Sequence, residues 1–133
     1  MKDVSRREFL LASAMGVASS ALPSIATSAE KAPMYGLIGK IDVVPGQRPA
    51  VVAALLEGVN AMPGCLSYVV AEDPADANAI WVTEVWDSKE HHANSLTLPA
   101  VQDAIRRARP YITGFSEHVE TNPVGGRGLV ATG

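Results

Sequence analysis

Two apolar runs, residues 65–71 and 80–86, stand near the middle of the chain and are separated by the polar segment DPADAN. Both runs are rich in β-branched and aromatic residues, and the Asp, Pro and Asn residues between them favour turns, so the pattern predicts a β-hairpin. Alternation along the second run places apolar bulk on both faces, with Ile80, Val82, Glu84 and Trp86 on one and Trp81, Thr83 and Val85 on the other. One face is expected to pack on the chain's own helices and the other on a second sheet, such as that of a partner subunit.

The segment before the hairpin predicts a strand followed by a helix. Residues 35–43 alternate as a strand with one buried side, and Pro45-Gly46 ends it. Pro49 suits the first turn of a helix, and residues 49–61 carry an apolar stripe of helical period.

The segment after the hairpin predicts helix and then strand, which completes a β-α-β-β-α-β order. Ser88 is a suitable N-cap for a helix through Leu96, and Pro99 starts a second helical segment that ends at Pro110. Residues 115–121 are the last predicted strand. Simple alternation places Phe115, Glu117 and Val119 on one face of it, and Ser116, His118 and Glu120 on the other.

Residues 1–29 are interpreted as a signal peptide. A charged start precedes residues 9–25, which carry no charge but are too mildly hydrophobic for a typical membrane anchor. Arg6 and Arg7 lie in SRREFL, which resembles the bacterial twin-arginine signal except that Leu11 replaces its common Lys. The pattern predicts export to the periplasm by the twin-arginine machinery, and the alternative is a retained N-terminal helix anchor.

Charge and cysteine content narrow the function classes. The first 29 residues hold three of the 11 Lys and Arg and two of the 14 Asp and Glu, so the remainder has a net charge of about −4 and is not built to bind nucleic acid. Cys65 is the only cysteine, which excludes an intrachain disulfide; it is interpreted as a small buried hydrophobe, with a reactive thiol as the alternative. The remainder suits one domain, residues 34–124, and a Gly-rich tail, residues 125–133, that is loose or lies on a partner.

Four motifs in a consistent order carry a family resemblance. They are PGCLSY at 63–68, EVWDSKE at 84–90, LPAV at 98–101 and ETNPV at 120–124. With them the chain resembles the antibiotic biosynthesis monooxygenase family, in the branch of small quinol monooxygenases. The resemblance implies an α+β, ferredoxin-like domain that pairs with a second copy as a dimeric αβ barrel. It also implies oxygenation of a small, electron-rich aromatic substrate such as a quinol by molecular oxygen, with no flavin, metal or haem cofactor.

Chemistry of this kind needs an aromatic-walled pocket that excludes water, a base for the phenolic proton and a hydrogen-bond donor for the developing charge. His92 is the predicted catalytic base, because histidine titrates near neutral pH without help. The predicted substrate-binding residues are Tyr68, Trp81, Trp86 and Tyr111 as walls, and Ser95 or His118 as donor. The structural alternatives are an ordinary helix histidine at His92 and core packing for Tyr68 and both tryptophans.

Other positions limit the range of activities. Many family members carry histidines at the positions of Ser95 and Ala100, so their roles do not transfer. Haem degradation is disfavoured because the positions that align with the helical Trp and His of haem-degrading relatives are Ser95 and Ile105. Adjacent His91 and His92 point to different faces of a helix, so no metal site is predicted. The side chains of Arg106, Arg107 and Arg109 are expected to form a solvated face, the alternative being that one steers an anionic substrate. The competing function is a non-catalytic dimeric barrel that binds a small ligand in the cell envelope.

Overall fold

The computed structural model describes residues 33–129, and the predicted signal peptide with Arg6 and Arg7 lies outside them. The predicted β-α-β-β-α-β order is confirmed, with a short 3-10 helix added before the last strand. The elements are β1 (Tyr35–Val43), α3 (Arg48–Gly58), β2 (Cys65–Glu72), β3 (Ala79–Trp86), α4 (Lys89–Ser95), α5 (Pro99–Ala108), η1 (Arg109–Tyr111) and β4 (Ile112–Thr121). None of the helices in this described part is long and apolar enough to cross a membrane.

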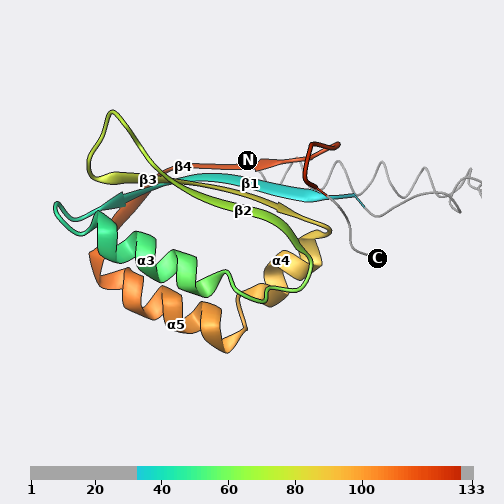
Figure 1. Cartoon of the computed structure of the whole chain (residues 1–133), viewed down its shortest axis with the longest axis horizontal. Helices are drawn as coiled ribbons and strands as arrows, with labels where there is room; N and C mark the ends of the chain where they lie inside the picture. Colours follow the sequence, from blue (N-terminus) through green and yellow to red (C-terminus); the bar gives the residue numbers. More distant parts are fainter. Residues whose placement is uncertain (1–32, 130–133) are drawn as a thin grey trace, which may run out of the picture. The chain divides into compact units, whose positions relative to one another are not determined.

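The four strands form one antiparallel sheet in the order β2-β3-β1-β4. Helices α3, α4 and α5 lie on one side of it, as Figure 1 shows. This arrangement is a ferredoxin-like α+β fold, as expected. The functional consequence is an asymmetric sheet, with one face turned to the helices and the other free of helices from the described residues.

The core lies between the sheet and the two longer helices. Val51 of α3 and Ile80 of β3 are fully buried, and the inward residues of β1 pack around them. Helices α3 and α5 approach closely because Gly58 has no side chain; a Cβ atom there would lie 2.8 Å from the Ala104 Cβ atom. This close packing positions α3 and α5 against each other on the far side of the space beneath the sheet.

Helix α4 is short but held firmly at its start. The hydroxyl of Ser88 accepts a hydrogen bond from the backbone N–H of His91 at 3.1 Å, which confirms the predicted N-cap. The His91 ring lies against Gly64, which has a positive φ of 85° and no space for a Cβ atom. The N-cap bond fixes where the helix that carries His92 begins.

Strand β4 differs from the prediction in two ways. It begins at Ile112 rather than at residue 115, because Ile112 pairs with Val43 of β1. The register also shifts near Ser116, so Phe115 shares the helix-side face with His118 and Glu120, and Glu117 shares the other face with Val119. The predicted faces of Phe115 and Ser116 were therefore wrong, because one extra residue in the strand reverses the alternation.

The helix-free face of the sheet carries a row of cross-strand neighbours with apolar members. Val69, Thr83, Ile38 and Val119 pair in sequence across β2, β3, β1 and β4, and paired residues point to the same side. Val69 and Val119 at its ends are about half exposed, at 52% and 46%. Trp81 and Val85 of β3 lie on this same face, opposite the buried Ile80, Val82 and Trp86, so apolar bulk on both sides of β3 is confirmed.

Candidate active site

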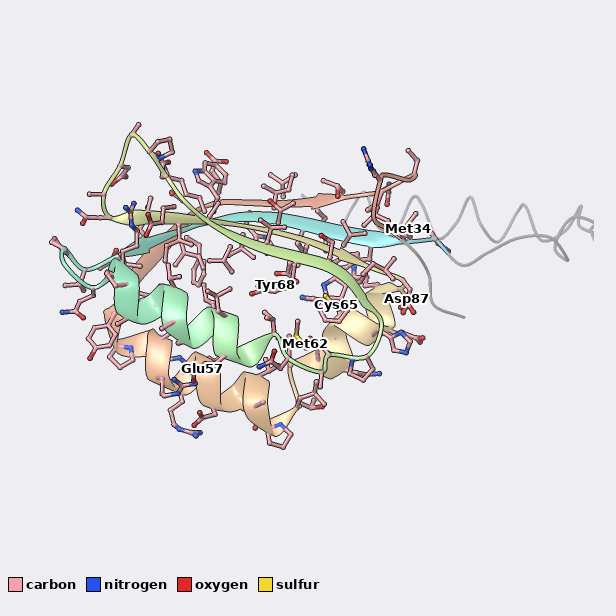
Figure 2. All side chains as sticks on the ribbon, in the orientation of Figure 1. Met34, Glu57, Met62, Cys65, Tyr68 and Asp87 are labelled. Carbon is pink, nitrogen blue, oxygen red and sulfur yellow. The ribbon has the colours of Figure 1, made fainter. Side chains whose placement is uncertain are left out.

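A cavity of about 570 Å³ lies between the helix side of the sheet and helices α3, α4 and α5. Figure 2 shows Tyr68 of β2 directed into the space between the sheet and the helices, with Met62 from the loop after α3 nearby. The lining is predominantly apolar. Its polar or titratable side chains are Tyr68, Glu84, Trp86, His92, Ser95, Arg109 and Thr113.

Glu84 is the carboxylate of this cavity, and its neighbour on the strand holds it in place. Its side chain is only 15% exposed, and its Oε1 atom accepts a hydrogen bond of 2.8 Å from the Trp86 indole N–H. Both side chains point to the helix side of β3, since they are two residues apart. A carboxylate in a mostly apolar lining is costly to bury without such a partner, so its position indicates a specific role.

His92 of α4 lies beside this carboxylate. Its Nε2 atom is 3.9 Å from Glu84 Oε1, which is too far for a hydrogen bond but within ion-pair distance of a protonated imidazole. The ring packs between two aromatic rings, with centroid distances of 5.2 Å to Tyr35 and 5.4 Å to Trp86. The imidazole is thereby held at the cavity wall with 20% of its side chain exposed.

Tyr68 faces Glu84 directly across β2 and β3. Burial raises the pKa of the Tyr68 hydroxyl far above its usual value, and the nearby Glu84 charge raises it further. The phenol therefore stays protonated and can donate a hydrogen bond to an oxygen atom bound in the cavity.

A second polar cluster supports the wall behind His92. The Tyr35 hydroxyl donates a 2.6 Å hydrogen bond to Glu120 Oε2, and Lys89 Nζ lies 3.6 Å from the same oxygen. Burial and the bond to Glu120 raise the pKa of Tyr35 to about 12, and the same bond lowers the pKa of Glu120. Because Lys89 begins α4 and Glu120 lies on β4, this cluster ties the His92 helix to the edge of the sheet.

The structure brings four of the seven predicted site residues to the cavity: Tyr68, Trp86, His92 and Ser95. Ser95 is buried, but its hydroxyl donates to the backbone carbonyl of His92 at 2.6 Å and is occupied there.

The other three predicted site residues lie outside the lining. Trp81 is on the helix-free face, where its N–H donates to Asp73 Oδ2 at 2.9 Å. Tyr111 of η1 and His118 of β4 are exposed, and neither reaches the cavity.

Glu84 is the site residue that sequence reasoning left unassigned. The signal was present, because this Glu shares a strand face with Ile80, Val82 and Trp86, which are all buried. Within residues 33–129, no group of three or more His, Cys, Asp and Glu side chains is arranged to hold a metal ion.

The fold and the cavity define a small ferredoxin-like domain with a predominantly apolar cavity beneath its sheet. The family model described as antibiotic biosynthesis monooxygenase matches residues 34–107, and the chain belongs to this family.

Solved structures agree with this assignment. The chain is 63% identical to a candidate antibiotic biosynthesis monooxygenase from Chloroflexus aurantiacus J-10-fl, with a TM-score of 0.72, over 73% of this chain and 99% of that one. A protein from Pseudomonas aeruginosa shares the fold at 18% identity and a TM-score of 0.63, over 72% and 99% of the two chains. A candidate antibiotic biosynthesis monooxygenase from Caulobacter crescentus CB15 shares the fold at 17% identity and a TM-score of 0.60, over 72% of this chain and 92% of that one. Comparison with the curated proteins found no match.

Proposed function

We propose that this protein is a monooxygenase that oxidises a quinol-like aromatic substrate with molecular oxygen and without a cofactor. The observation that carries the proposal is the grouping of His92, Glu84 and Tyr68 in a predominantly apolar cavity. Its volume of about 570 Å³ suits a small aromatic molecule.

Each of the three side chains has a separate task in this proposal. His92 takes the proton from a substrate hydroxyl, and the Glu84 carboxylate stabilises the imidazolium that forms. Tyr68, whose hydroxyl stays protonated, donates a hydrogen bond to a substrate oxygen as negative charge develops. The apolar lining limits water, which strengthens both interactions.

Deprotonation makes the aromatic ring electron-rich enough to reduce oxygen. The quinol anion transfers one electron to O₂, and the two radicals combine to form a C–O bond at a ring carbon, giving a hydroperoxide once protonated. Loss of water then leaves one oxygen atom on the ring, so one quinol and one O₂ give one hydroxyquinone and one H₂O. The ring loses four electrons and O₂ gains them, so no outside reductant is needed.

The test is oxygen uptake by purified, metal-depleted protein with a panel of hydroquinols, using ¹⁸O₂. Enzyme-dependent uptake is expected, with one ¹⁸O atom in each product molecule and one in water. Uptake at the buffer's own autoxidation rate across the panel, combined with measurable ligand binding, would contradict the proposal and favour a non-catalytic binding barrel.

We also propose that two copies pack their helix-free sheet faces together. The supporting observation is the half-exposed row that ends in Val69 and Val119, on a sheet face that no described helix covers. The protein is expected to have twice the chain mass by light scattering at micromolar concentration.

The double variant Val69→Lys/Val119→Lys tests this packing. It is expected to raise the dimer dissociation constant more than tenfold, because the added lysines are desolvated and repel one another at the interface. Leu56→Lys on the outer surface of α3 is the control and should leave the mass unchanged, since Leu56 is 50% exposed on the opposite side of the molecule. A monomeric wild-type protein would refute the proposal.

A further inference from the structure

Three arginines lie close together at the end of α5 and the start of η1, and the structure separates them. Arg106 and Arg107 both pair with Asp103, and Arg107 also pairs with Glu57 at 2.8 Å. Arg109, by contrast, makes no ion pair with any carboxylate among residues 33–129. Its guanidinium is the member of this group that is available to a ligand.

Arg109 also stands at the junction of two cavities. It lines the site cavity, and it lines a second, more open hollow of about 550 Å³ over the ends of α4 and α5. The two spaces share Leu96, Ile105 and Arg109. The Arg109 side chain is therefore within reach of a ligand in either space.

Glu84 and Arg109, which both line the site cavity, carry opposite charges. Glu84 lies at the inner polar wall, where an anionic group of a ligand would be repelled. Arg109 lies at the outer end, and its guanidinium suits a carboxylate through two parallel hydrogen bonds. A ligand with a phenolic ring and an acidic substituent is therefore oriented with the ring inward and the acid outward.

We infer that Arg109 is a specificity-determining residue that binds an anionic substituent, and that the substrate is a quinol-like aromatic carrying a carboxylate or a similar acidic group. This inference rests on the proposed function for the aromatic part of the substrate. Arg109 directly follows α5, which lies on the side of the sheet opposite the helix-free face (Figure 1), so sheet-to-sheet pairing of two copies leaves it accessible.

The test is anaerobic calorimetric titration with 2,5-dihydroxyphenylacetate and with its neutral amide. Without oxygen the measurement reports binding alone. Wild-type protein is expected to bind the acid about tenfold more tightly than the amide, as a charged hydrogen-bonded contact provides. Arg109→Gln is expected to remove that difference while leaving the affinity for the amide unchanged.

Arg107→Gln is the matched control. It removes the same charge two residues before Arg109, and the Arg107 side chain lines neither cavity. It should keep the preference for the acid. The inference is overturned if the wild type binds the acid and the amide equally or does not detectably bind the acid. It is also overturned if Arg109→Gln keeps the preference for the acid, or if both variants lose that preference equally. Oxygen uptake is measured separately: an intact acid preference without uptake overturns the oxidation proposal and not the role of Arg109.

Discussion

Replacing His92 by alanine is expected to lower enzyme-dependent oxygen uptake with a hydroquinol by about 10²- to 10⁴-fold, the usual contribution of a positioned general base. The loss should appear in kcat, because the imidazole is needed to form the anion rather than to fill the cavity. The geometry behind this expectation is the 3.9 Å approach of His92 Nε2 to Glu84 Oε1 at the cavity wall. Glu84→Gln should reduce the same rate, since the stabilising charge is lost.

His91 provides a matched control on the same helix. Its Nδ1 atom lies 2.6 Å from Asp87 Oδ1, its side chain is 46% exposed, and it does not line the cavity. His91→Gln should therefore keep the wild-type rate. Full activity in His92→Ala, with folding confirmed by circular dichroism, would contradict the assignment of the base.

Trp86→Ala is expected to produce a large loss of stability, about 3–5 kcal/mol in the free energy of unfolding. The side chain is only 1% exposed and packs in a cluster with Tyr35 and Leu37. Its loss leaves a cavity, and it also deprives the buried Glu84 carboxylate of its 2.8 Å hydrogen bond. Urea unfolding with an unchanged m-value, at one fixed protein concentration, measures the effect.

Two further variants separate packing from hydrogen bonding. Trp86→Phe keeps much of the ring volume but removes the indole N–H, so it should cost less than Trp86→Ala, about 1–3 kcal/mol. Phe115→Ala is the aromatic control, because Phe115 is 63% exposed and its truncation should cost less than 1 kcal/mol, roughly the range for surface positions. Equal losses in Trp86→Ala and Phe115→Ala would refute the packing argument.

The local elements were predictable because their signals are local. Periodicity and turn residues place the two hairpin strands within one residue of their observed bounds, and Ser88 caps α4 as its side-chain chemistry requires. The last strand was less predictable. Its register shift near Ser116 depends on pairing with β1, and a strand's own sequence does not reveal where its partner will force an extra residue.

The candidate site was predictable in part. The sequence singled out His92 for its chemistry, and the structure places it against Trp86 at the cavity that Tyr68 also lines. Trp81 was an equal candidate with Trp86, because alternation shows that two residues lie on opposite faces but not which face meets the helices. Glu84 followed the same pattern as its buried neighbours, yet its approach to His92 of α4 depends on a contact between separate elements.

The sequence by itself determined the order of strands and helices and the existence of a strand with apolar bulk on both faces, since these follow from residue types at neighbouring positions. Only the tertiary structure decided which face of β3 covers the cavity and which histidine reaches Glu84. It also decided which of Arg106, Arg107 and Arg109 has no carboxylate partner among residues 33–129. Those outcomes depend on side chains from different strands and helices that meet only after the sheet and helices have packed, and no local pattern records which of them will meet.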